Sequence, residues 1–172
     1  TREAQDQFAY HSHQKAIAAQ KAGDFAHEMT TIDVVEKFPR LGSAELDVRT
    51  RSVKLDEGPR ADTSIEALAK LRPVFAAKGS VTAGNSSQTS DGAGALIVAS
   101  ERAVKQFSLT PLARFVTFAI RGVPPEIMGI GPIAAIPKVL KTTGVRQQDL
   151  GWIELNEAFA AQSLAVIRDL GP

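Results

Sequence analysis

The spacing of hydrophobic and polar residues changes along this chain, and the change predicts two differently organised regions. A stripe of small or apolar residues recurs near the start at helical spacing: Phe8, Ser12, Ala16 and Ala19. This stripe predicts an amphipathic helix over residues 2–22, with polar side chains on its other faces. Thr1 is suited to cap the start of this helix, and Gly23 is suited to end it.

The stretch that follows is more charged and predicts irregular structure with two short strands, near residues 29–34 and 48–53. Thr63 and Glu66 have the spacing of a capping box, in which each side chain bonds the backbone of the other residue. A helix from Ser64 to about Leu71 is therefore expected next.

From about residue 91 onward the pattern alternates between strands and helices, which is typical of a layered α/β fold. Strands are expected in this region at 95–99, 112–120 and 152–155, the first of them buried, and a further short strand is expected before it at 81–83. Helices are expected at 100–106, 134–143 and 158–170, with Ser100 as a cap. Pro137 is tolerable only in the first turn of its helix, where a missing N–H does no harm. Residues 1–90 form a separate, less regular lobe in this interpretation.

Composition and charge exclude several classes of protein. The chain has 20 basic and 19 acidic residues, so it lacks the basic excess of a nucleic-acid-binding protein. It has no apolar run of the roughly 20 residues that span a bilayer. It contains no cysteine, which rules out disulfides, thiolate metal ligands and a cysteine nucleophile within these residues. His11 and His13 point to different faces of the expected helix, so no metal site is expected.

The junction of a strand and a helix near residue 156 is the strongest candidate site. Asn156 and Glu157 lie between the two elements, where ligands bind in open α/β sheets. A helix start also offers unpaired N–H groups that could hold a polarised carbonyl oxygen. The alternative is that Asn156 is a plain helix cap, with Glu157 placed in the first turn by the helix dipole.

Two glycine-containing segments are weaker candidates. Gly84-Asn85-Ser86-Ser87 is either a ligand-contacting loop or a surface turn. Met128-Gly129-Ile130-Gly131-Pro132 opens a helix but lacks the pattern of a nucleotide-binding loop. Met128 either belongs to the core or lines an apolar pocket.

Five blocks of sequence, taken in order, resemble the thiolase family over nearly the whole chain. The first block is Thr1-Arg2-Glu3-Ala4-Gln5-Asp6-Gln7-Phe8-Ala9, followed by Ser12-His13-Gln14-Lys15-Ala16. The second block is Asp56-Glu57-Gly58-Pro59-Arg60, followed by Leu68 to Phe75. The other three are Val81-Thr82-Ala83-Gly84-Asn85-Ser86-Ser87 with Asp91-Gly92-Ala93, Gly122 to Pro132, and Asn156-Glu157-Ala158-Phe159.

The resemblance implies an α/β fold, a partial form of the layered α-β-α-β-α thiolase fold with part of its inserted loop domain. Residues 1–90 would be the loop-domain portion. Residues 91–111 would end the N-terminal core half, and residues 112–172 would begin the C-terminal core half. Both halves would be incomplete, so the chain is expected to be an internal fragment.

The family reaction is acyl transfer between thiols through a cysteine thiolate, a second cysteine and a histidine. This chain carries neither cysteine nor the histidine block, so it is expected to be inactive alone. Asn156 matches the asparagine that holds a water in the oxyanion hole. The resemblance implies contacts with the substrate or coenzyme A (CoA) for six further residues: Arg60, Phe75, Ala83, Ser87, Met128 and Phe159. One departure is Ala67, where some relatives carry a nucleotide-contacting serine.

The expected function is part of an acyltransferase that cleaves 3-ketoacyl-CoA by thiolysis in fatty-acid β-oxidation, a choice favoured by Gly58-Pro59. The alternatives are an acetoacetyl-CoA thiolase fragment and a non-catalytic module that binds CoA or a partner protein. Acyl-CoA and CoA are the expected partners, with CoA as co-substrate and no other cofactor. A homo-oligomer is expected, in the cytoplasm of a bacterium or an organelle matrix of a eukaryote.

Overall fold

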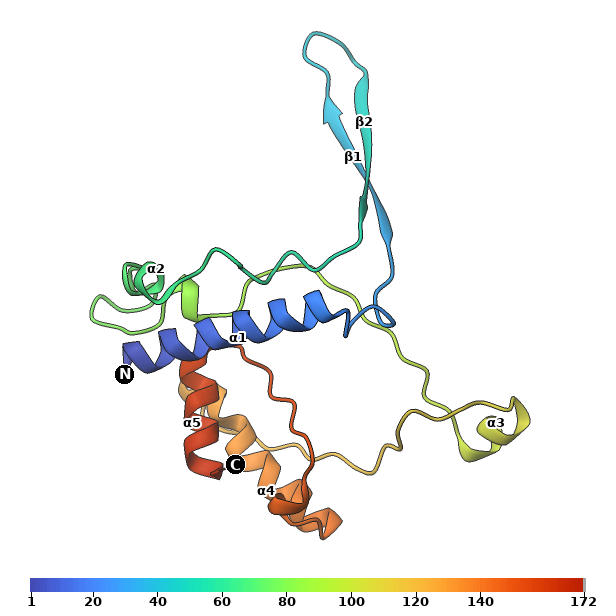
Figure 1. The fold of residues 1–172 in the computed structure, drawn as a ribbon, viewed down its shortest axis with the longest axis vertical. Coiled ribbons are helices and arrows are strands. Elements are labelled where there is room, and N and C mark those ends of the chain that lie inside the picture. The colour runs from blue at the N-terminus through green and yellow to red at the C-terminus, as the bar shows by residue number, and fades with distance from the viewer. Residues whose placement is uncertain (172) are drawn as a thin grey trace.

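The structure is a computed structural model that describes residues 1–171. A long helix, α1, runs through the middle of the molecule (Figure 1). A two-stranded hairpin projects from one side of this helix, and two helices, α4 and α5, lie on the other side. A long extended excursion carries a short helix, α3, well away from the rest.

Helix α1 spans Arg2–Ala22 and confirms the first predicted element. The Thr1 hydroxyl accepts a hydrogen bond from the Ala4 N–H at 3.2 Å. Gly23 ends the helix in the left-handed conformation, with φ of 79°, which glycine adopts without steric cost. The predicted stripe is half-buried, and two polar residues beside it, Gln5 and Asp6, are fully buried.

The hairpin consists of β1, Ile32–Pro39, and β2, Leu46–Val53, paired antiparallel. The second predicted strand is confirmed, but the first lies further along the chain than predicted. The register explains the difference, because Ile32 pairs with Val53 at the end of β2. Residues before Ile32 therefore have no facing strand to bond with.

Helix α2 spans Ile65–Ala69, and its cap differs from the predicted one. The Ser64 hydroxyl, not that of Thr63, accepts a hydrogen bond from the N–H of Ala67, at 3.1 Å. The strand predicted at 81–83 is also wrong. Thr82 makes a single bridge with Pro73, and a short 3₁₀ helix, η1, follows at Ala83–Asn85.

Three further predicted strands, at 95–99, 112–120 and 152–155, are extended but unpaired within residues 1–171. The segment 95–99 is exposed rather than buried, and Ile97 is 91% exposed. A β-strand needs a neighbouring strand for its backbone N–H and C=O groups. The sequence carries the β-propensity, but the described chain supplies no partner. The predicted helix between the first two segments is confirmed as α3, Glu101–Gln106, with Ser100 as its cap.

The C-terminal elements are η2, Pro125–Ile130; α4, Gly131–Thr143; η3, Gln147–Asp149; and α5, Ala160–Leu170. Both predicted helices are confirmed, but each begins at a different residue. Helix α4 begins earlier, so Pro137 lies inside it and not in its first turn. Helix α5 begins only at Ala160, so Asn156 is not its cap and Glu157 is not in its first turn.

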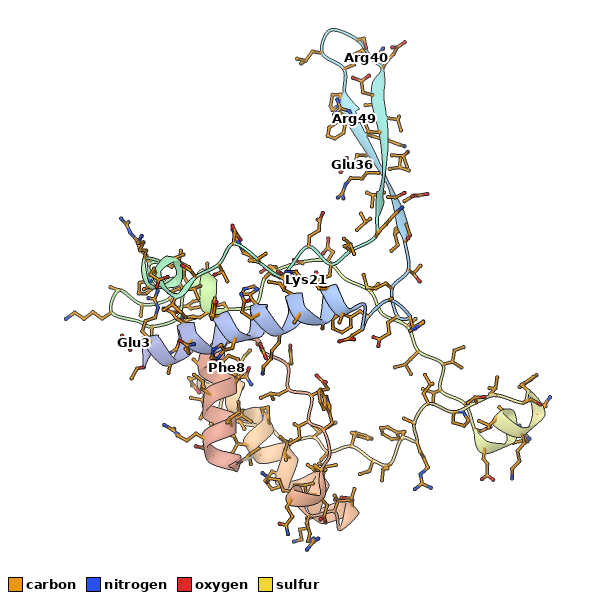
Figure 2. All side chains as sticks on the ribbon, viewed as in Figure 1. Glu3, Phe8, Lys21, Glu36, Arg40 and Arg49 are labelled. Carbon is orange, nitrogen blue, oxygen red and sulfur yellow. The ribbon has the colours of Figure 1, made fainter. Side chains whose placement is uncertain are left out.

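The buried apolar residues of the described chain are few and lie on three helices: Ala9 on α1, Leu68 on α2, and Ala160 and Val166 on α5. Helix α1 contacts both α2 and α5. Figure 2 shows Phe8 at the crossing of α1 over α5. Within the described residues, no helix combines the length and apolar character needed to cross a membrane.

Candidate active site

A cleft of about 880 Å³ lies between α1, the segment that leads into α2, and the segment that contains η1. Three residues expected to contact CoA line this cleft together: Arg60, Ala83 and Ser87. Ala67, the departure from the family pattern, lines it as well. Residues far apart in the sequence thus surround one open space, large enough for a small-molecule ligand.

A second cleft, of about 470 Å³, lies between η2 and the start of α5. It brings together Asn156, Met128 and Phe159, three of the predicted site residues. Met128 therefore lines a pocket and is not part of the core, which resolves the alternative left open by the sequence. Glu126 and Gln162 line the same cleft, and the sequence analysis missed both.

Backbone pairing joins the two clefts. Ser86 forms a β-bridge with Phe159, and the Ser87 N–H donates to the carbonyl oxygen of Ala158 at 2.9 Å. Ser87 lines the large cleft, and Ala158 lines the small one. The segment that carries Asn156 is therefore held against the segment that carries Ser87.

Phe75 lies beside this junction. Its ring meets the ring of Phe159 edge-to-face, with the ring centroids 6.0 Å apart. This geometry is favourable for aromatic pairs. Phe75 lines neither of these two clefts of the described chain, and it is 75% exposed. It packs on a residue of the small cleft instead.

Arg60 forms a two-point ion pair with Asp62, with its Nη2 and Nε atoms 2.9 and 3.2 Å from the carboxylate oxygens. The hydrogen bond from Arg60 lowers the pKa of the Asp62 carboxyl, and the same bond raises the pKa of Arg60. The Arg60 backbone N–H donates to Nδ1 of His13 on α1 at 3.1 Å. This bond gives His13 a structural role and fixes the backbone of Arg60 beside α1.

Glu157 accepts a hydrogen bond from the Ser12 hydroxyl on α1 at 2.5 Å. Both residues line the large cleft. The contact ties the Asn156 segment to the N-terminal helix across 145 positions of sequence. No local pattern could have revealed this partner for Glu157.

The Gly84 segment is not a plain surface turn. Thr82 is completely buried and Asn85 is 2% exposed. A Cβ atom on Gly84 would lie 2.5 Å from side-chain carbons of Leu68 and of Leu71. Glycine at this position therefore lets η1 approach the α2 region this closely without displacing the two leucine side chains.

Two models of known protein families match the chain. A model described as the thiolase N-terminal domain matches residues 1–102, and one described as the thiolase C-terminal domain matches residues 109–172. The chain belongs to the thiolase family. The fold is accordingly a partial thiolase fold of helices and strands.

Sequence identity to individual thiolases, and structural similarity to one of them, support this assignment. The chain is 46% identical to a 3-ketoacyl-CoA thiolase of Bacillus subtilis, over 99% of this chain and 44% of that protein. It is 50% identical to an acetyl-CoA acetyltransferase of Pseudomonas aeruginosa, over 99% of this chain and 41% of that one. A crystal structure of Bacillus anthracis acetyl-CoA acetyltransferase superposes with a TM-score of 0.90 at 42% identity, covering 100% of this chain and 41% of the other. The chain thus spans about two fifths of the length of these relatives.

Proposed function

We propose that this chain supplies the CoA cleft and the oxyanion-hole asparagine of an acyltransferase that cleaves 3-ketoacyl-CoA by thiolysis. The observation that carries the proposal is the pairing of Ser86 and Ser87 with Ala158 and Phe159, which joins the two clefts. A CoA arm that lies along Ser87 would point its thioester toward Asn156. The fatty-acid β-oxidation setting, in a bacterial cytoplasm or an organelle matrix, belongs to this proposal.

Six of the seven predicted site residues, all except Phe75, have a physical role in this arrangement. The Asn156 carboxamide both donates and accepts, so it can orient a water that stabilises the oxyanion. Arg60 carries a positive charge suited to the phosphates of CoA. Ser87 and the backbone at Ala83 offer hydrogen bonds to the pantetheine amides, and Met128 and Phe159 give the small cleft apolar walls.

The chain itself provides no thiolate, because it contains no cysteine. We therefore expect the chain alone to bind CoA without turning over acetoacetyl-CoA. A spectrophotometric thiolysis assay on material free of host enzymes tests this expectation. Measurable turnover would contradict it, and binding without turnover agrees also with a non-catalytic CoA-binding module.

A second candidate is the acetoacetyl-CoA branch of the family. The 50% identity to an acetyl-CoA acetyltransferase favours it. The two candidates differ in the acyl chain that the apolar walls accept. Tighter binding of a long-chain 3-ketoacyl-CoA than of acetoacetyl-CoA in calorimetric titrations would favour the first candidate, and equal or weaker binding would favour the second.

Arg60→Ala is the sharpest single test of the CoA cleft. Loss of a cation that faces phosphate should weaken CoA binding by about 3- to 10-fold, measured by isothermal titration calorimetry. Arg146→Ala is the matched control. Arg146 is exposed to a similar degree and forms the same two-point ion pair, with Asp149.

Arg146 does not line either of the two clefts within the part of the chain described. Its loss should therefore leave CoA affinity within about 2-fold of the wild type. Equal losses of affinity in both variants would show that general charge, and not this cleft, attracts CoA. Unchanged affinity in Arg60→Ala would remove Arg60 from the site.

A further inference from the structure

Asp6 is a buried carboxylate on α1 that bonds to Arg2 on the same helix and to Asn85 in η1. It is 2% exposed. Its Oδ2 atom accepts a hydrogen bond from Nε of Arg2 at 2.7 Å. Its Oδ1 atom accepts one from Nδ2 of Asn85 at 2.9 Å. A carboxylate has only acceptor atoms, so it suits a place where two donors converge.

Both donors continue into walls of the large cleft. Nη2 of Arg2 donates to the carbonyl oxygens of Leu68 and Leu71, at 2.6 and 3.0 Å, where α2 ends. Nδ2 of Asn85 also donates to the Ser80 carbonyl oxygen, at 3.0 Å. Oδ1 of Asn85 accepts from the Thr82 N–H at 2.8 Å. Asp6 therefore lies between α2 on one side and η1 on the other.

The η1 side of this network reaches the Asn156 pocket. Ser86 and Ser87 directly follow η1, and they pair with Phe159 and Ala158. A change in the position of Asn85 would shift the backbone that holds Asn156. Asp6 itself is not among the residues that line either of the two clefts in the described chain.

We propose that Asp6 is a positioning residue that holds both walls of the CoA cleft, and the Asn156 segment behind one wall, without touching the substrate. Through Arg2 it fixes the end of α2, and through Asn85 it fixes η1 and the Ser87–Ala158 pairing. The role in CoA binding depends on the proposed function, whereas the mechanical coupling does not. Hydrogen exchange measures the mechanical coupling, and calorimetry measures CoA binding.

Asp6→Asn is the central variant, because it keeps the volume and replaces one acceptor by a donor. One of the two donors, from Arg2 or Asn85, then loses its partner in a buried place. Hydrogen exchange at the Ser87 and Thr82 amides should become about 10-fold faster. The Kd for CoA, measured by calorimetry, should rise by about the same factor.

Val166→Ala is the control for a purely structural effect. Val166 is 3% exposed on α5 and contributes apolar packing. At a temperature where both variants are fully folded, Val166→Ala should leave Ser87 exchange and CoA affinity within about 2-fold of the wild type. Equal effects in both variants, or none in Asp6→Asn, would overturn the proposal.

Arg2→Lys tests only the α2 wall of the cleft. It still allows the proposal to be refuted if Asp6→Asn does not fold. Lysine keeps the charge but loses the fork that reaches Asp6 and the α2 carbonyls together. CoA affinity should fall by about 3-fold while Ser87 exchange stays within about 2-fold. Wild-type affinity in Arg2→Lys would contradict the α2 half of the proposal. If the wild type itself binds no CoA, the proposed function fails, and the exchange rates alone decide the role of Asp6.

Discussion

At the scale of single residues, the geometry of the candidate site depends on a few side chains, or missing side chains, at points of close contact. Gly84 lets η1 pack on Leu68 and Leu71 of the α2 region. Ser64 caps α2, and the Ser12 hydroxyl holds Glu157. The sequence could nominate Gly84 and Asn156, because glycine and asparagine in loops are distinctive. It could not nominate Ser12 or Asp6, whose partners lie far along the chain.

Gly84→Ala should destabilise the protein. The added methyl group would lie 2.5 Å from side-chain carbons of both leucines, so the leucine side chains, η1 or α2 must shift. Overpacking of this kind costs about 1–3 kcal/mol in the free energy of unfolding, measured by urea denaturation. Gly92→Ala is the control, because a Cβ atom there meets nothing within 4 Å. A loss as large in the control would show that the effect comes from loop flexibility.

At the scale of elements, the helices followed the sequence pattern, whereas most of the predicted strands did not form. All five α-helices found in residues 1–171 lie within a few residues of their predicted positions, because helical hydrogen bonds are local. Only the hairpin among the predicted strands is paired in the described chain. The predicted start of α4 was wrong, because the helix begins earlier and Pro137 therefore lies in its interior.

Pro137→Ala should stabilise α4. Proline at this position has no N–H for the carbonyl of Ile133, and its side chain is exposed. Alanine restores the donor and the helix propensity, although it also adds freedom to the unfolded chain. The net gain should be about 1–2 kcal/mol in the free energy of unfolding, followed by circular dichroism.

Lys141→Ala, an exposed substitution in the same helix, should change the stability by less than about 0.5 kcal/mol. A loss of stability in Pro137→Ala would mean that the proline ring makes contacts that outweigh the missing hydrogen bond. The two variants together separate the backbone effect from a general effect of surface substitution.

At the scale of the whole molecule, the chain exposes much of its apolar surface. The hairpin projects freely, and its polar surface includes Glu36, Arg40 and Arg49 (Figure 2). The excursion around α3 exposes two apolar extended segments, 95–99 and 112–120. Large apolar patches and unpaired strand edges favour association with other chains.

We therefore expect the isolated chain to self-associate through these extended segments. Light scattering at moderate concentration should report a mass above that of one chain, and Ile97→Lys should lower it. Ile97 is 91% exposed, so the substitution should not disturb the fold. A clean monomer for the wild type would refute this expectation.

The sequence by itself determined the family, the approximate positions of the helices and most of the candidate site residues. These follow from local periodicity and from motifs in order, both of which survive without knowledge of distant contacts. Only the tertiary structure decided which residues share a cleft, that Asn156 precedes α5 instead of capping it, and that Arg60 faces Asp62. It also decided which extended segments pair, because strand pairing and buried networks such as that of Asp6 join residues that no local pattern connects.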